Sequence, residues 1–200
     1  MATGDRHIYK DVVANAGTVN IQPAVGVYYL ITDIIVSGEI QIRYNPVVVA
    51  GGPGGAYQCH STETKGEMLN LKLLSMNDCY LSLYNDSGGV IYYEVGAIEI
   101  PGPLWYNAQQ IAHGVTGTAP VLSTGQEGYI SQICICNAEF AFTGSGGIMI
   151  DWLSCVSYDS YIGYIYQGLN FQTNQGYAPI PINYSGVNTG QVIFMGYRTK

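Results

Sequence analysis

Alternation of apolar and polar residues with a period of two restricts the fold more than any other feature of this chain. In EIQIRY (39–44), the two isoleucines and Tyr44 fall on one face of an extended strand and the polar residues on the other. The same pattern occurs in LNLKL (69–73), CYLSLY (79–84) and IMIDW (148–152), and turn sequences such as AGGPGGA, NDSGG and SGVNTG separate such runs. Short strands between frequent turns predict an all-β sandwich or barrel.

A helical pattern occurs in one place. In PLWYNAQQIAHG (103–114), Pro103 could begin a helix and Gly114 could follow its end. The same segment could equally be an extended connector.

An internal echo divides the chain. YLITDIIVSG (29–38) resembles YISQICICNA (129–138), and an offset of 99 places Leu30, Thr32, Ile34 and Val36 on Tyr129, Ser131, Ile133 and Ile135. Nearer the end of each half, GGVIYYEVGA (88–97) resembles GQVIFMGY (190–197) after a gap of about two residues. We therefore predict two small β-sandwich domains in tandem. The alternative is one larger sandwich whose two sheets use strands from both halves.

The predicted domain boundaries follow from this division. We expect an N-terminal arm over 1–17, a first β-sandwich over 18–101, a connector over 102–118 and a second β-sandwich over 119–200. The connector region is rich in proline, as a boundary between domains often is.

Composition excludes several partners. Charged residues make up 10 % of the chain, against roughly 25 % in an ordinary soluble domain. The net charge is −7 and the seven Lys and Arg residues are scattered, so we expect no nucleic-acid binding. No apolar run approaches the ~18 residues of a membrane-spanning helix, and no signal peptide is evident. We expect no membrane association and a protein kept or assembled in a cytoplasm.

The five cysteines do not indicate a disulfide framework, because their number is odd and no secretion signal accompanies them. Cys134 and Cys136 would share one face of a strand, where a metal pair is conceivable. Buried free thiols are the favoured interpretation, since no further ligand completes a tetrahedral set. We therefore predict no metal site.

The sequence also lacks a recognisable catalytic set. Cys59, His60 and Glu63 are close in sequence, but nucleophile, base and orienting residue meet in space rather than in sequence. The NDSGG oxygens (85–87) could contact calcium, although an Asx turn explains them more simply. GGPGG (51–55) lacks the lysine and following helix of a phosphate loop. We predict a protein that is not an enzyme and that uses no cofactor.

Eighteen tyrosines in a chain with few charges suggest large contact surfaces. We predict self-association through the outer face of strands 80–84 and 90–95, with Tyr80, Tyr84 and Tyr92 as anchors. Trp105, expected in the connector, is the further interface candidate and the better of the two tryptophans for stacking on a sugar ring.

The patterns VYYLITDIIVSG (27–38) and CYLSLYNDSGGVIYYEVGAIEI (79–100) resemble the jelly-roll-like virion proteins of tailed bacteriophages. The resemblance covers residues 18–100 and, more faintly, 118–198. It implies a non-enzymatic virion protein that is assembled in the host cytoplasm, most concretely a capsid decoration or cement protein. It also implies a homotrimer that contacts the major capsid protein or tail proteins, with no fixed motif for contact. The alternative is a tail or fibre accessory, or a receptor-binding module, that binds carbohydrate.

Overall fold

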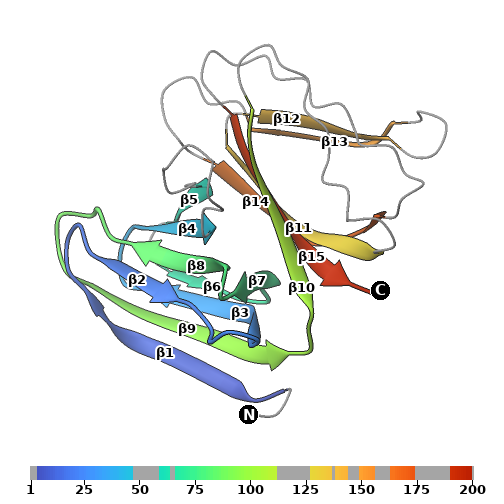
Figure 1. Ribbon diagram of the computed structural model, residues 1–200. Helices are drawn as coiled ribbons and strands as arrows, with labels where there is room; N and C mark the ends of the chain where they lie inside the picture. The colour runs from blue at the N-terminus through green and yellow to red at the C-terminus, as the bar shows by residue number, and fades with distance from the viewer. Residues whose placement is uncertain are drawn as a thin grey trace. The chain divides into compact units, whose positions relative to one another are not determined.

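The computed structural model describes residues 4–46, 59–63, 66–111, 127–136, 138–143, 149–155, 163–173 and 190–199 (Figure 1). Every regular element in these ranges is a β-strand, so the predicted all-β fold class is confirmed. The chain forms two compact units, residues 1–104 (unit 1) and 105–200 (unit 2). No described sheet combines strands of the two. A search of the described part of the chain found no helix long and apolar enough to cross a membrane.

Unit 1 is one nine-stranded antiparallel sheet that folds over into two layers (Figure 1). The first layer contains β1 (Arg6–Val13), β9 (Ile91–Ile100), β3 (Tyr28–Val36), β6 (Gly66–Met68) and β7 (Leu73–Met76). The second layer contains β2 (Thr18–Ile21), β8 (Cys79–Tyr84), β4 (Ile40–Pro46) and β5 (Cys59–Glu63). The tight turn between β7 and β8, where Met76 pairs with Cys79, carries the chain from one layer to the other.

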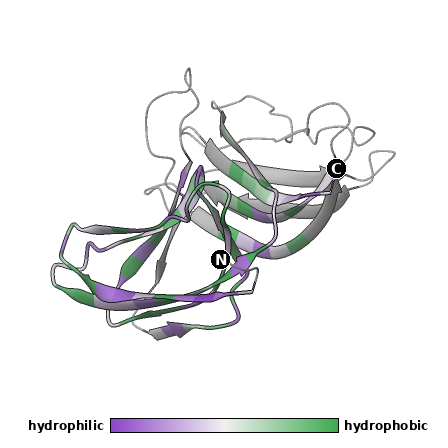
Figure 2. Cartoon of the chain, turned by 60° about the horizontal axis from the view of Figure 1, so that its bottom comes forward, coloured by the Kyte–Doolittle hydropathy of each residue, from purple (hydrophilic) through white to green (hydrophobic). Residues whose placement is uncertain are grey.

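The core of unit 1 lies between these layers and follows the predicted alternation, which Figure 2 shows as hydrophobic and hydrophilic residues in succession along the strands. In β4, Ile40, Ile42 and Tyr44 are buried, and the Tyr44 hydroxyl donates a hydrogen bond to the Leu74 carbonyl at 2.9 Å. In β8, the buried apolar residues are Cys79, Leu81 and Leu83. Buried Ser75 of β7 donates to the Ile21 carbonyl of β2 at 2.7 Å and so ties the layers together.

A β-bulge in β3 changes which residues face the core. The pairing of β3 with β9 shifts between Ile31 and Asp33, so Ile31 and Ile34 are both fully buried although three positions separate them. The sequence analysis placed Leu30, Thr32, Ile34 and Val36 on one face, which is wrong at this point. Leu30 and Thr32 are only half-buried, because the bulge reverses the phase of the alternation.

The predicted strand over 69–73 is also wrong in its first part. Residues 69–72 separate β6 from β7, and Leu69 is 57 % exposed rather than part of the core. Asn70 has φ = 58°, a left-handed conformation that no regular strand allows. The Leu71 N–H donates to the Thr32 carbonyl at 2.8 Å, so the segment between β6 and β7 is hydrogen-bonded to the bulge in β3.

Unit 2 contains a four-stranded sheet and a hairpin (Figure 1). The sheet has the order β10 (Leu104–Ile111), β15 (Gly190–Arg198), β11 (Gly128–Cys136) and β14 (Gly163–Thr173). The hairpin pairs β12 (Ala138–Thr143) with β13 (Met149–Cys155). The described core of this unit includes Ile130, Ile133, Cys134, Ile193, Phe194 and Met195.

The two units repeat one plan at an offset of 99 residues. In unit 1, Ile31 pairs with Ala97 and Ile34 with Val95; in unit 2, the positions 99 residues later pair in the same way, as Ile130 with Gly196 and Ile133 with Phe194. The bulge recurs as well, between Ile130 and Gln132. The sheet order β1-β9-β3-β7 corresponds to β10-β15-β11-β14. The internal echo in the sequence is therefore a structural duplication.

This duplication corrects one detail of the sequence alignment. The alignment of 88–97 with 190–197 assumed a gap of about two residues, whereas β9 and β15 correspond at the same offset of 99 as β3 and β11. The gap arose from matching the Val-Ile letters of the two segments. Those letters, Val90-Ile91 and Val192-Ile193, are 102 residues apart and so miss the offset of 99 by three residues.

Two predicted segments differ from the structure. Residues 6–13 of the expected arm form β1, which pairs with β9 from Arg6 to Val13 and contains Ile, Tyr and Val residues that favour a strand. Residues 104–111 of the expected connector form β10, so neither a helix nor a free linker exists there. The GGPGG loop lies outside the described residues. Independent folding of the two units stays a prediction.

Candidate interaction surfaces

Unit 1 presents two outer sheet faces of different chemistry. We call the first the ribbon face; it consists of the outward side chains of β1 and β9, namely Arg6, Ile8, Lys10, Val12, Tyr92 and Glu94. We call the second the polar face; it consists of the outward side chains of β2, β8 and β4, namely Thr18, Asn20, Tyr80, Ser82, Tyr84, Gln41, Arg43 and Asn45. The faces belong to different layers and point in opposite directions.

The ribbon face combines exposed apolar side chains with charged ones. Ile8, Val12 and Tyr92 are 65 %, 56 % and 43 % exposed, and Val90, directly before β9, is 68 % exposed. These four are most of the large apolar side chains that the described residues leave exposed. They lie on or next to the same two strands, whereas single exposed apolar residues are usually scattered over a surface. Val12 is directly opposite Tyr92, and Lys10 is opposite Glu94, so the ribbon combines apolar contact area with charges of both signs.

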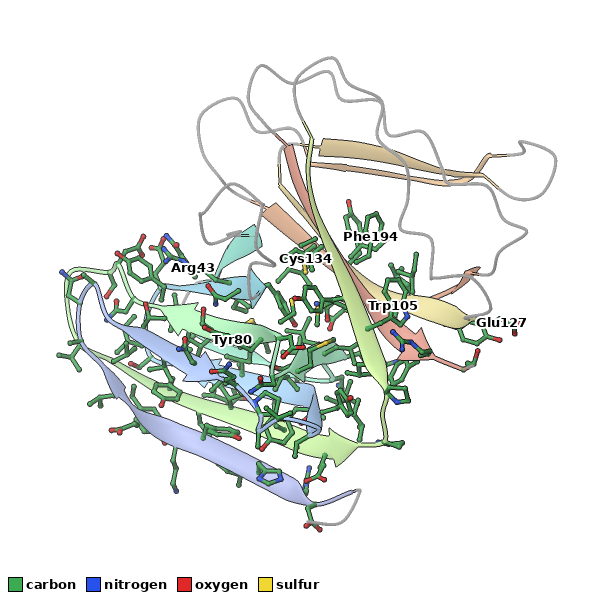
Figure 3. The ribbon with its side chains drawn as sticks, in the orientation of Figure 1. Arg43, Tyr80, Trp105, Glu127, Cys134 and Phe194 are labelled. Atoms are coloured by element: carbon green, nitrogen blue, oxygen red, sulfur yellow. The ribbon has the colours of Figure 1, made fainter. Side chains whose placement is uncertain are left out.

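The polar face is covered by side chains that bind one another. The Arg43 guanidinium lies 3.5 Å from the centre of the Tyr84 ring and donates hydrogen bonds to the Gln41 Oε1 at 3.0 and 2.6 Å. Asn45 donates to the Ser82 hydroxyl at 2.6 Å. Partial burial lowers the pKa of Arg43, which Tyr84 and then Asp86 counteract. Figure 3 shows Arg43 and Tyr80 in this layer.

The predicted interface residues do not form one surface. Tyr80 and Tyr84 lie on the polar face and are half-buried, whereas Tyr92 lies on the ribbon face. Their common surface was inferred from strand alternation alone, which cannot tell which layer each strand joins. Trp105 is 5 % exposed and its Nε1 donates to the Tyr197 carbonyl at 3.2 Å within unit 2 (Figure 3). It is a core residue and cannot stack on a sugar in this structure.

A cluster of polar side chains missed by the sequence analysis lies where β1, β3 and β9 meet. His7 Nε2 is 3.7 Å from Glu99 Oε2, and neither atom has a hydrogen-bond partner among the described residues. The centre of the Tyr29 ring lies 4.9 Å from that of the His7 ring and 6.1 Å from that of the Tyr9 ring. Burial, and then the hydrogen bond with Tyr29, raises the pKa of Tyr9. The cluster holds β1 against the sheet.

Asn85 has a structural role that argues against calcium at the NDSGG turn. Its Oδ1 accepts hydrogen bonds from the Ser87 N–H at 2.9 Å and the Ser87 hydroxyl at 2.8 Å, which is an Asx turn. Its Nδ2 donates to the Val13 and Gly89 carbonyls at 2.8 and 2.7 Å. This residue is fully buried, so its oxygen is committed to the turn.

The described residues hold no metal-binding cluster. A search of them found no group of three or more His, Cys, Asp and Glu side chains placed to hold a metal. The side chains of Cys59, His60 and Glu63 lie outside the described part of the structure, as does that of Cys136. Cys79 and Cys134 are buried free thiols, in agreement with the favoured interpretation of the sequence.

Cys134 should resist alkylation while the protein is folded. Burial raises the pKa of its thiol to about 12, although a hydrogen bond from the Gln132 Nε2 at 3.3 Å opposes this. The reactive thiolate is therefore scarce at pH 8. We expect iodoacetamide to leave the Cys134 peptide unmodified in native protein and to modify it fully in 6 M guanidinium, as measured by peptide mass spectrometry. Equal modification in both states would contradict a buried Cys134.

Comparison with known proteins yields low-similarity structural matches only. The major capsid protein P2 from bacteriophage PM2 matches with a TM-score of 0.40 and 8 % identity, covering 98 % of both chains. A structure of Sulfolobus Turreted Icosahedral Virus matches with a TM-score of 0.32 and 11 % identity, covering 98 % of this chain and 90 % of that one. The PBSX exported protein XepA matches at 0.30 and 9 %, covering 96 % and 86 %. No protein-family model matches the sequence, and no curated protein is significantly similar to it.

Proposed function

We propose that the chain is a non-enzymatic structural protein of a bacteriophage virion, most concretely a capsid decoration protein bound to the major capsid protein as a homotrimer. The observation that carries this proposal is the duplicated β-unit. Two copies of one sheet plan, each with a buried apolar core, provide surfaces for contact, and the described residues hold no metal-binding cluster. The resemblance of 27–38 and 79–100 to jelly-roll-like virion proteins supports the same role.

The exposed surface is compatible with permanent contacts. Only 10 % of residues are charged, and the ribbon face exposes Ile8, Val12 and Tyr92 to solvent. Apolar contact area of this kind is normally covered by a partner. A shell made of many identical subunits would supply that partner repeatedly, without any need for a ligand pocket.

Co-sedimentation with capsid shells tests the decoration role. The purified protein is mixed with shells assembled from the major capsid protein encoded by the same genome, and pelleted through a sucrose cushion. We expect saturable binding at a fixed ratio to the capsid subunit, and the protein itself among those identified by mass spectrometry in purified virions. Its absence from both shells and virions would contradict the proposal.

A carbohydrate-binding tail or fibre module remains the second candidate, and the polar face favours it. Tyr80 is half-buried beside Asn45, its partner in register, so an aromatic ring and hydrogen-bonding groups are adjacent. On a glycan array, this function predicts a signal that Tyr80→Ala removes and Tyr92→Ala retains. A capsid decoration protein would give no signal with either variant or with the parent.

A further inference from the structure

The polar face of unit 1 holds a positive charge that no described carboxylate pairs with. Among the side chains that define this face, Arg43 is the charged one. It is half-buried, and it forms no ion pair with a carboxylate of the described residues. Its contacts are with neutral groups, namely the Gln41 side-chain oxygen and the Tyr84 ring. Removing a cation partly from water has a free-energy cost that an opposite charge offsets best.

The neighbouring side chains hold the Arg43 guanidinium in one orientation. The Gln41 Oε1 accepts its Nε and Nη2 hydrogen bonds, and the Gln41 Nε2 in turn donates to the Asp86 carboxylate. The Tyr84 ring centre lies 3.5 Å from the guanidinium carbon. Gln41 therefore occupies the side of the guanidinium, and its end, formed by Nη1 and Nη2, meets no described carboxylate. An arginine end of this kind binds a carboxylate through two parallel hydrogen bonds.

The composition of the polar face is typical of the centre of a protein interface. The residues that define it include two tyrosines and one arginine, and no lysine, aspartate or glutamate. Tyrosine and arginine are enriched at interface centres, whereas lysine, aspartate and glutamate are depleted. The ribbon face differs, since Arg6, Lys10 and Glu94 all lie on it.

We propose that the polar face binds the capsid partner, and that Arg43 binds a carboxylate side chain of that partner through its Nη1 and Nη2 edge. This inference rests on the proposed virion role and adds to it the contact surface and the chemistry of the contact. The occupant is acidic because a carboxylate neutralises the one charge of the face. Tyr80 and Asn45, the next outward pair along β8 and β4, provide a ring and an amide beside the ion pair.

Two matched charge removals test the site. Arg43→Gln removes one positive charge from the polar face, and Lys10→Gln removes one from the ribbon face, where Lys10 is exposed. In the co-sedimentation assay with capsid shells, we expect R43Q to raise the dissociation constant by about 30-fold and K10Q by less than about threefold. Arg43→Lys keeps the charge but lacks the planar fork, so we expect an intermediate increase of about tenfold.

Two further measurements accompany the assay. Circular dichroism and thermal unfolding check that each variant is folded. Raising the salt concentration from about 50 to about 300 mM should weaken shell binding of the parent more than that of R43Q, because R43Q has already lost the screened ion pair.

Equal effects of R43Q and K10Q would mean that only net charge matters, and would overturn the proposal. If the parent binds shells and R43Q binds them equally well, this inference fails while the virion role stands. A parent absent from both shells and virions overturns the virion role and this inference together. If R43Q instead weakens self-association in sedimentation equilibrium and leaves shell binding unchanged, the face belongs to a second copy and the proposal is wrong.

Discussion

Ile34→Ala and Ile133→Ala should each lower the free energy of unfolding by about 2–5 kcal/mol, because each removes a fully buried side chain from the core of its unit. The two residues are equivalent in the duplication and pair with Val95 and Phe194 respectively. Calorimetry of the two variants also tests the domain division. If the units fold independently, Ile34→Ala moves only the transition of unit 1 and Ile133→Ala only that of unit 2.

Ile35→Ala is the matched control, since Ile35 adjoins Ile34 on the opposite face of β3 and is half-buried. Its cost should be much smaller than that of Ile34→Ala. Similar costs for the two would mean that the bulge between Ile31 and Asp33 does not set the phase of the strand. A single transition that both core variants shift equally would contradict independent units.

Gly196→Ala is expected to destabilise unit 2 by about 3 kcal/mol, because a Cβ at this position would collide with the Tyr129 carbonyl oxygen. It would also lie 3.1 Å from the Ile130 Cα. Both obstacles are backbone atoms of β11 at its bulge, so no side-chain rotation relieves the overlap. The melting temperature of unit 2, followed by calorimetry, measures the effect.

The equivalent position in unit 1 provides the control. It is occupied by Ala97, which is 2 % exposed. Ala97→Gly should cost only about 1 kcal/mol, through added flexibility of the unfolded chain and lost contacts. If Gly196→Ala were as mild as Ala97→Gly, the close approach of β11 to β15 would be refuted.

Local alternation was sufficient to predict several strands of this chain, among them β4 and β8. Tyr44, Leu81 and Leu83 are buried as their spacing indicated, because a strand in a two-layered structure turns one face to the core and the other to solvent. The offset of 99 was also detectable, since Ile34 and Ile133 occupy equivalent positions in corresponding strands. These features depend on residues close together in sequence or repeated along it.

Alternation could not predict the layer to which each strand belongs. Tyr84 and Tyr92 are close in sequence and both point outward, yet the chain changes layer between them. The bulges were equally hidden, because they appear only in the pairing of β3 with β9 and of β11 with β15. The exposed edge of β1 depends on which strand lies beside it. The position of a strand at the edge of a sheet is a property of the assembled sheet.

Because the two units repeat one plan, a strand of one unit could pair with the corresponding partner strand of the other unit during folding. β3 and β11 share a register, so β3 could start a sheet with β15, and β11 with β9. Just after each bulge the native pairs differ: the Asp33 carboxylate fills the side-chain space above Gly96, whereas Gln132 donates to the Met195 sulfur at 3.2 Å. Exchanged partners would press Asp33 against Met195 and leave Gln132 without that acceptor. We therefore expect residues 33 and 132 to favour the native strand pairing within each half over the exchanged pairing.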